Sequence, residues 1–396
     1  MLKKVFPLLF WTTIFASPIF GSILVVLDMP VQSGMLQEMI IPLAVLSYLL
    51  LLANYKYFAY DRSVKKVFAV ELLIIVMYLG TSLFYSNPPE NAKEYWGTLY
   101  YFGSLCVASS IQGCYLAQYN SFEKIEKLIP FFTIPISLII GTFGLSSYYK
   151  YLGVQGVTSA LDYQNISYFM SDCYLCSLYY LFFSSISSTR FYKWTRLPVF
   201  ISMLFSAAIC IVAGGRGGFV VLFVISLFVI YILHKTGRMN MWKIIITLGL
   251  ALFIFSIIAS ELGVWESSGF QRISETLTQD DNRVDLYKKA WKSVQESILF
   301  GHGLGSIWWE VGFYCHNMFL DLLVDLGSIG AFIVLLCMFK IFYKSLQLSK
   351  RNYVYVLIMF LMLKALINTS FSGYWLNTQL FWLVLGFVTT RTNKLF

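Results

Sequence analysis

The sequence predicts an all-helical protein that crosses a membrane many times. Hydrophobic residues make up 58% of the 396 residues, charged residues make up only 12%, and the mean hydropathy is +0.70. An ordinary soluble domain has about a quarter charged residues, so this chain has too few polar side chains to cover a water-facing surface. Repeated apolar runs approach the ~20 residues that cross a hydrocarbon core about 30 Å thick. A water-soluble globular protein is therefore excluded.

The apolar runs predict about twelve transmembrane helices in one integral membrane domain that covers the whole chain. They lie at residues 5–27, 38–55, 67–86, 95–118, 128–148, 166–187, 197–213, 217–233, 243–262, 317–340, 353–371 and 374–391. The first run resembles a secretory signal peptide because Lys3 and Lys4 precede it. Its apolar stretch is longer than the usual ~7–15 residues, so we expect a retained helix.

Basic residues are distributed unevenly between the connections that join these spans. If the N-terminus is cytoplasmic, the segments on that side hold most of the 29 Lys and Arg. The short outer connections hold only Lys93, Lys150 and Arg216. This positive-inside bias predicts that both termini are cytoplasmic. The net charge of +9 is therefore a topology signal, aided by anionic membrane lipids, and gives no reason to expect a nucleic-acid partner.

The cysteines do not predict a disulfide framework. Most of the seven fall within predicted spans, where a free thiol behaves as a small hydrophobe. Cys173 and Cys176 form a C-x-x-C pair, which we interpret as packing because it lies inside an apolar run. Only Cys315 is expected at the outer surface.

One long loop, residues 263–316, lies on the outer side between the ninth and tenth spans. It is too short for an independent domain, so we expect it to pack on the helices. Its middle predicts an amphipathic helix, with N-cap oxygens at Asp280, Asp281 and Asn282. Apolar residues then recur at spacings of three and four along one face, at Val284, Tyr287, Trp291, Val294 and Ile298. We expect this helix to lie along the membrane surface.

A glycine-rich turn at residues 301–305 follows this helix and contains His302. The two residues Trp308 and Trp309 come next, and their amphipathic rings suit the membrane interface.

Arg216 lies on the outer side between two spans, with glycines at 214, 215, 217 and 218. Glycines let a backbone approach a ligand closely. The next span would begin here, so its N-terminal N–H groups and positive dipole end would face outward beside the guanidinium. That combination is a good receptor for a phosphate. The alternative is a tight hairpin whose Arg extends to the interface; we favour the anion site because a bare hairpin needs no Arg at this depth.

Three further candidates lie in or beside the long loop. Arg283 begins the amphipathic helix, but its spacing from Asp280, Asp281 and Glu296 favours a salt bridge, and Arg272 is a similar, weaker candidate. His316 stands at the outer start of the tenth span and could activate a hydroxyl. An interfacial His bonded to backbone fits the same position equally well.

Polar residues follow His316 at helical spacing, at Asn317, Asp321, Asp325 and Ser328. Ionisable groups inside a span usually face the bundle interior or a water-filled cavity. A metal site at Asp280 and Asp281 is not favoured, because no His or third acid lies at a useful spacing and the pair suits a helix cap.

Together these features resemble the O-antigen polymerase and ligase superfamily, bacterial membrane glycosyltransferases of the GT-C type. The resemblance covers roughly residues 210–335, about a third of the chain. Three features carry it: the glycine-flanked Arg216, the stretch from Arg272 through Arg283 to the 301–305 turn, and Cys315-His316-Asn317-Met318-Phe319-Leu320 followed by Gly327 and Gly330. The remainder agrees in helix number and topology. Two departures are Ser297-Ile298, where many members have a proline, and His302 inside the turn.

The resemblance implies an undecaprenyl-diphosphate-linked oligosaccharide as donor and acceptor, at the periplasmic face of the bacterial inner membrane. Arg216 and Arg283 would hold the diphosphate, and His316 would activate the acceptor hydroxyl. Arg272, Asn317, Asp321 and His302 are candidates for supporting roles, and His302 also competes with His316 for the catalytic one. Transfer would be inverting and metal-independent, so neither a metal nor a cofactor is expected. A polysaccharide chain-length regulator is a candidate partner.

Two alternatives remain open at the level of sequence. A polymerase joins one lipid-linked repeat unit to another, whereas a ligase moves the chain to lipid A core; the shared motifs do not decide, and the loop favours a polymerase. A flippase or transporter for the same saccharide would also have many spans. It would need charges along a central cavity, whereas the unusual polar residues here concentrate on the outer side, which favours an enzyme.

Overall fold

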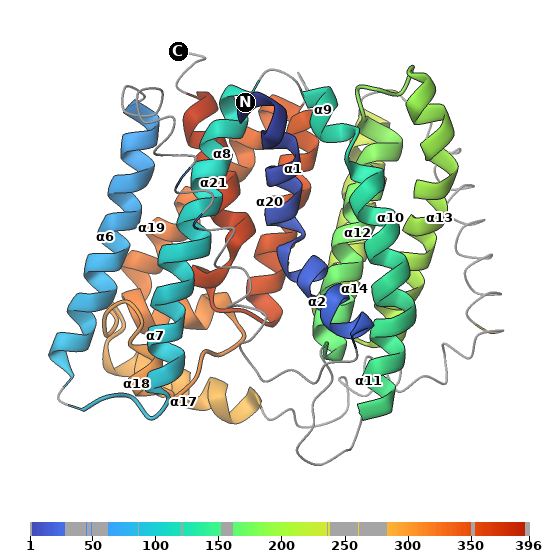
Figure 1. Ribbon diagram of the computed structural model, residues 1–396. Helices are drawn as coiled ribbons and strands as arrows, with labels where there is room; N and C mark the ends of the chain where they lie inside the picture. Colours follow the sequence, from blue (N-terminus) through green and yellow to red (C-terminus); the bar gives the residue numbers. More distant parts are fainter. Residues whose placement is uncertain are drawn as a thin grey trace.

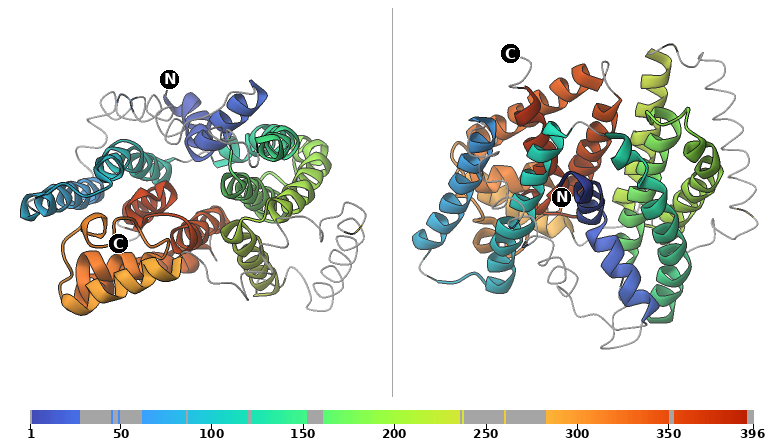
Figure 2. Two further views of the ribbon diagram at one scale, coloured as in Figure 1. Left: turned by 90° about the horizontal axis from the view of Figure 1, so that it is seen from below. Right: turned by 45° about the horizontal axis from the view of Figure 1, so that its top comes forward.

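The computed structural model describes residues 2–27, 62–85, 87–119, 122–151, 161–235, 283–349 and 353–392, and the isolated positions 45, 49, 237 and 260. Every regular element within these ranges is helical. The long helices run roughly parallel to one another and form a bundle (Figures 1 and 2). This arrangement confirms the predicted all-helical class.

In the part of the chain that the structure describes, six helical segments are long and apolar enough to cross a membrane. They are α6 (Arg62–Phe84), the run Phe122–Lys150, α13 (Arg190–Ala213), α14 (Arg216–Lys235), α19 (Met318–Ser349) and α20 (Val354–Phe371). The run Phe122–Lys150 combines α9 (Phe122–Glu126), α10 (Ile129–Ile139), the π-helical η2 (Ile140–Gly144) and most of α11 (Leu145–Tyr151). A bent pair, α1 (Leu2–Ile14) and α2 (Ala16–Val26), adds a seventh span if the two helices, inclined at 69°, cross together.

The other predicted spans have different outcomes. The span predicted at residues 95–118 falls in a helical run of α7 (Ala92–Tyr101), the π-helical η1 (Phe102–Cys106) and α8 (Val107–Gln118). The span predicted at residues 166–187 largely coincides with α12 (Tyr163–Phe183). Neither of these two is among the six. The last span is shorter than predicted, because the 3-10 turn η4 (Trp375–Asn377) precedes α21 (Gln379–Thr392). The spans predicted at 38–55 and 243–262 lie outside the described residues, so the total of about twelve stays a prediction.

The two ends of the bundle differ in the segments that they carry. At one end, which we call the basic end, α6 and α13 begin and α14 finishes. Lys65, Lys66, Arg190 and Lys193 belong to the first turns of α6 and α13 there. At the other, the loop end, lie α17 (Arg283–Glu296), α18 (Ile307–Glu310) and the start of α19 (Figure 1). The loop end also carries basic residues, since α17 contains Arg283, Lys288, Lys289 and Lys292, so the orientation inferred from the charge asymmetry stays a prediction.

Close helix packing depends on small residues at particular crossings. A Cβ atom at Gly113 of α8 would overlap the carbonyl oxygen of Leu383 in α21, and one at Gly386 of α21 would overlap the carbonyl oxygen of Ser110. Both glycines therefore let the two backbones touch, which is how membrane helices gain van der Waals contact without a hydrophobic driving force.

Candidate active site

The hairpin that carries Arg216 is packed tightly on α12. Gly214 closes α13 with a φ of 75°, a left-handed conformation that favours glycine. The hydroxyl of Ser167 donates to the carbonyl oxygen of Gly215 over 3.0 Å. A Cβ at Gly215 or Gly218 would overlap Ser167, and one at Gly217 would overlap the hydroxyl of Tyr168. Gly215, Gly217 and Gly218 therefore serve this helix contact, and the close approach of a ligand to the hairpin stays a prediction.

Arg216 is the first residue of α14, and its side chain is half-buried. The N-terminus of α14 lies at the loop end of the bundle (Figure 1). The first-turn N–H groups of a helix and its positive dipole end attract anions. Position and charge together favour an anion site at this hairpin, which stays a prediction.

Two tyrosines and a serine connect this hairpin with the segments around it. The hydroxyl of Tyr168, which touches the position of Gly217, donates to the hydroxyl of Ser372 over 2.5 Å. Ser372 directly follows α20, and its carbonyl oxygen accepts from the hydroxyl of Tyr314 over 3.4 Å. The hairpin, α12, the end of α20 and the segment before α19 therefore meet at one place.

Arg283, the first residue of α17, belongs to the same place. Its positive charge is close enough to Tyr314 to act on the pKa of that hydroxyl. Burial, and next the charge of Asp321, raises the pKa of Tyr314 to about 12, while Arg283 opposes the rise. Tyr314 is therefore a neutral hydroxyl at physiological pH, able to donate a hydrogen bond but not to act as a base.

His316 is held in an unusual conformation beside Tyr314. Its φ is 53°, and it is the only residue other than glycine with a positive φ in the part of the chain that the structure describes. Its ring meets that of Tyr314 edge-on, with centroids 4.5 Å apart, and lies 5.7 Å from that of Phe313. Backbone strain of this kind costs about 1–3 kcal/mol and persists only where the surroundings impose it, often at functional sites.

The residues on either side of His316 impose that conformation. The amide N–H of Cys315 donates to Oδ1 of Asp321 over 2.8 Å. The side chain of Asn317 accepts from the amide of Phe319 over 3.0 Å, which makes Asn317 the N-cap of α19. Asn317 and Asp321 therefore fix the backbone just before and after His316, a geometry that suits the supporting roles expected of them.

Two expectations about neighbouring residues were wrong. Cys315 is fully buried instead of lying at the outer surface, and burial raises the pKa of its thiol, so it remains protonated. Trp308 is 1% exposed and does not reach the interface. Its ring packs edge-on against Phe313, Tyr314 and Tyr374, because the loop folds back over it. Trp308 thus packs against Phe313 and Tyr314, the two rings that contact His316.

The glycine-rich turn is seated against a break in α19. Gly327 interrupts that helix with a φ of 63° and a ψ of −174°. The amides of His302 and Gly303 donate to the carbonyl oxygens of Val324 and Asp325, each over 2.9 Å. A Cβ at Gly301 or Gly327 would overlap the facing backbone. Glycine is required on both sides of this contact.

Asp325 fastens the same turn with its side chain. Its Oδ1 accepts from the amide of Ile307 over 3.1 Å and from the hydroxyl of Ser306 over 3.3 Å, and its Oδ2 accepts from the hydroxyl of Tyr374. Both Asp321 and Asp325 are fully buried. The two acids of the polar stripe therefore face the folded loop and the interior, which agrees with the first of the two predicted surroundings.

The predicted amphipathic helix is present as α17, but its apolar face divides in two. Tyr287 and Val294 pack toward the bundle, together with Ala290 and Ser293, whereas Val284, Trp291 and Ile298 are exposed. The periodicity was correct, yet α17 lies on α19 with one side and presents a second apolar stripe outward. Trp291 is 52% exposed on that stripe, which is suited to a membrane surface.

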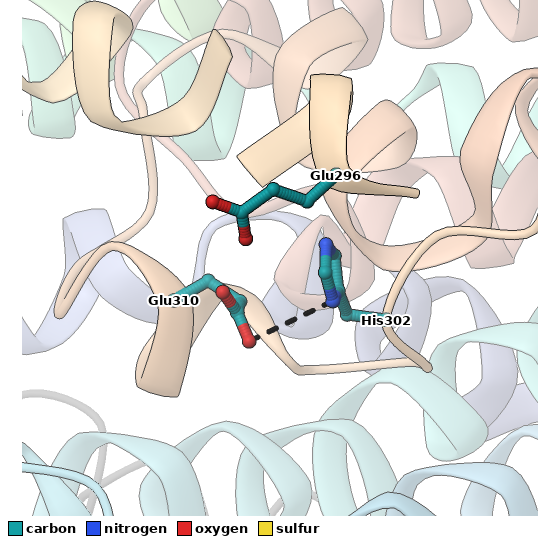
Figure 3. A group of neighbouring side chains, drawn as sticks. All are labelled: Glu296, His302 and Glu310. Carbon is teal, nitrogen blue, oxygen red and sulfur yellow. Dashed lines mark ion pairs between the residues drawn. The ribbon is translucent and has the colours of Figure 1, made fainter. Parts of the chain in front are cut away.

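His302 makes its contacts away from the tyrosines and His316. Its Nε2 lies 2.9 Å from the carbonyl oxygen of Ser293, and its Nδ1 lies 3.7 Å from Oε1 of Glu310 (Figure 3). These partners favour His316 as the imidazole of the candidate site. Arg272 lies outside the described residues, as do Asp280, Asp281 and Asn282.

Sequence reasoning missed the groups that link the site. Tyr168 and Ser372 are separated by 204 positions, and nothing in a chain with 27 tyrosines distinguishes Tyr168. Tyr314 could have been found, because it lies two positions before His316. A buried ion pair was also missed: Lys364 of α20 pairs with Asp172 of α12, and its Nζ is 3.4 Å from the carbonyl oxygen of Tyr168.

These features define a multi-pass helical membrane protein with two arginines, an imidazole and two tyrosines gathered at one end of its bundle. Residues 201–335 match the family described as O-antigen ligase. About a third of the chain is therefore similar to a domain of the O-antigen ligase and polymerase superfamily. The matched range includes Arg216, Arg283 and His316. No curated protein matches the chain.

Proposed function

We propose that this protein is a polymerase that joins undecaprenyl-diphosphate-linked oligosaccharide repeat units at the periplasmic face of the bacterial inner membrane. The observation that carries the proposal is the meeting of the Arg216 hairpin, Arg283 and His316 around Tyr168, Tyr314 and Ser372. A pair of cations can stabilise a leaving diphosphate, and an imidazole can accept the proton of an acceptor hydroxyl.

The arginines would bind the diphosphate of the donor. A guanidinium presents several N–H donors in a planar fork that matches phosphate oxygens, and it stays charged at any physiological pH. Negative charge grows on the diphosphate as its bond to the sugar breaks, and fixed donors stabilise that charge most in a site that excludes water. The helix N-terminus beside Arg216 adds N–H donors of the same polarity.

His316 would accept the proton of the acceptor hydroxyl. The oxygen of that hydroxyl forms a bond to C1 of the donor sugar, the bond from C1 to the diphosphate oxygen breaks, and its electron pair leaves with undecaprenyl diphosphate. Attack from the opposite side inverts the configuration at C1. The neutral hydroxyl of Tyr314, edge-on to the imidazole, donates to the carbonyl oxygen of Ser372 and cannot compete for the proton.

A ligase that transfers the saccharide to lipid A core is the second candidate function. The description of the matched family favours it. The donor chemistry is the same, so the acceptor alone separates the two. A flippase is a weaker candidate, because the cations and His316 gather at one end of the bundle rather than along its length.

The phenotype of a deletion strain separates these candidates. For a polymerase we expect the deletion strain to carry single repeat units on lipid A core and no long chains. The wild-type gene should restore the long chains, whereas Arg216→Ala, Arg283→Ala and His316→Ala should not, at equal protein levels in the membrane. Bare core with polymer on the carrier lipid would instead identify a ligase. Loss of all surface saccharide, with lipid-linked units retained in the cytoplasmic leaflet, would identify a flippase.

The membrane contacts and partners follow from the same proposal. Val284 and Trp291 on the outward side of α17, together with Ile298 just after it, would lie in the lipid interface beside the site, close to where a lipid-linked substrate arrives. A chain-length regulator would act on the polymer as it leaves this face.

A further inference from the structure

Three side chains outside the candidate active site form a compact donor group at the loop end. Glu296 closes α17, His302 lies in the glycine-rich turn, and Glu310 closes α18. One ligand atom from each lies within 4.8 Å of the others. Figure 3 shows the two carboxylates and the imidazole turned toward a common space. Glu296 is exposed, and the other two side chains are half-buried, so a small ion can reach them from water.

The hydrogen bond of His302 determines which of its nitrogens is available. Its Nε2 lies 2.9 Å from the carbonyl oxygen of Ser293, and a carbonyl oxygen only accepts, so Nε2 carries a proton. In the neutral ring Nδ1 then holds a lone pair, 3.7 Å from Oε1 of Glu310. A lone pair and two carboxylates facing one space repel one another unless a cation lies between them.

The groups around these donors are arranged as in metal sites. A metal-binding histidine usually donates its second N–H to a carbonyl or carboxylate oxygen, as His302 does to Ser293. Glu310 is itself oriented, because its Oε1 accepts from the hydroxyl of Tyr85 over 2.8 Å. Tyr85 directly follows α6, and its ring stacks on that of Trp309 at 4.6 Å.

We propose that Glu296, His302 and Glu310 bind a divalent transition-metal cation, with Zn²⁺ the ion that best suits one imidazole nitrogen and two carboxylate oxygens. Mg²⁺ and Ca²⁺ prefer oxygen ligands alone, whereas Zn²⁺ accepts both donor types and leaves a fourth position for water. The ion ties the end of α17 to α18 across the glycine-rich turn, and through Tyr85 to the end of α6. It holds the loop and takes no part in glycosyl transfer, since His302 and Glu310 contact Ser293 and Tyr85 rather than Tyr314 or Ser372.

The competing occupant of this space is a proton. Protonation of Nδ1 would convert the contact between His302 and Glu310 into an ion pair. Nδ1 would then have no lone pair with which to bind a metal ion. A metal site binds one ion per chain and gives the spectrum of a bound ion, whereas a site occupied by a proton does neither.

Purified full-length protein in detergent, freed of metal with a chelator, tests the proposal by titration with Zn²⁺ and separately with Mg²⁺, followed by calorimetry and by the midpoint of thermal unfolding. We expect one Zn²⁺ per chain and a higher unfolding midpoint, with no saturable response to Mg²⁺. Co²⁺ should give visible absorption bands typical of a low-coordinate site with a nitrogen ligand.

Variants assign the binding to these three residues. His302→Ala and Glu310→Gln should weaken Zn²⁺ binding at least about tenfold and remove the shift in midpoint. Glu296→Gln, at an exposed position, tests the third ligand without endangering the fold. The matched control Asp285→Asn changes an exposed acid near the other end of α17 and should bind Zn²⁺ as the wild type does. The proposal is overturned if the wild type shows no saturable Zn²⁺ binding. It is also overturned if Glu296→Gln and His302→Ala both bind Zn²⁺ as tightly as the wild type does.

Discussion

Substitution of Gly217 by Ala probes the contact that ties the Arg216 hairpin to α12. A Cβ at this position would overlap the hydroxyl of Tyr168 and lie 2.7 Å from Cζ of its ring. The tyrosine is held by its hydrogen bond to Ser372, so it cannot yield without breaking that bond. Either Tyr168 moves away from Ser372 or α14 moves away from α12.

The cost can be worked out from these contacts. Loss of one hydrogen bond costs about 1 kcal/mol, and forcing a methyl group into a packed contact costs about 1–3 kcal/mol. The higher helix propensity of Ala returns about 1 kcal/mol. We therefore expect the free energy of unfolding to fall by about 1–3 kcal/mol. We expect activity to fall further, because a shift of about 1 Å in a binding group can cost about 100-fold.

The assay compares thermal unfolding and transferase activity of Gly217→Ala with two references. Gly80→Ala in α6 is the matched control, since a Cβ there meets nothing within 4 Å and the substitution should be neutral or slightly stabilising. Tyr168→Ala supplies the space that the new methyl group needs, so adding Gly217→Ala to it should cost under about 0.5 kcal/mol. The reasoning is refuted if Gly217→Ala costs the same with and without Tyr168, or behaves as Gly80→Ala does.

Three further predictions concern the supports of the site. Lys364→Met should lower the free energy of unfolding by about 3–5 kcal/mol by leaving Asp172 buried and unpaired, and adding Asp172→Leu should restore most of it in the same unfolding assay. Asp325→Ala leaves the amide of Ile307 and the hydroxyl of Tyr374 without this acceptor, which should destabilise the loop by about 1–3 kcal/mol for each lost hydrogen bond. Limited proteolysis of the loop should therefore be faster than in the wild type, and an unchanged cleavage rate would contradict this prediction. Because the pKa of Tyr314 is raised from 10.0 to about 12, its contribution to stability is complete below pH 10 and is lost as pH rises toward 12. The difference in unfolding midpoint between wild type and Tyr314→Phe should therefore be constant below pH 9 and shrink above pH 10; a change between pH 6 and 8 would show that another group titrates.

Local patterns in the sequence were sufficient for the helices and for the side on which the polar residues gather. Apolar runs and basic clusters act over one span at a time, so α6, α13, α14, α19 and α20 could be located from composition alone. The start of α17 at Arg283 could likewise be predicted from residues adjacent in the chain.

Long-range contacts could not be predicted, because they depend on which helices become neighbours. The spacing of Asp321 and Asp325 places them on one face, but it does not tell whether that face meets water or a folded loop. In the same way, the apolar positions of α17 did not reveal that Val294 would pack on protein while Trp291 would be exposed. The left-handed backbone of His316 lies between Cys315, whose amide bonds to Asp321, and Asn317, which caps α19, and no propensity indicates this arrangement.

The most direct test of the proposed function is a reconstituted reaction with purified protein and undecaprenyl-diphosphate-linked repeat units. We predict release of one undecaprenyl diphosphate for each repeat unit added, with a rate that added Mg²⁺ or Mn²⁺ does not change. His316→Ala should lower this rate by about 10²–10⁴-fold while binding the lipid-linked donor as tightly as the wild type, whereas Arg216→Ala and Arg283→Ala should also weaken donor binding. Chain growth at the wild-type rate in His316→Ala, or a strict requirement for added Mg²⁺ or Mn²⁺, would contradict the account.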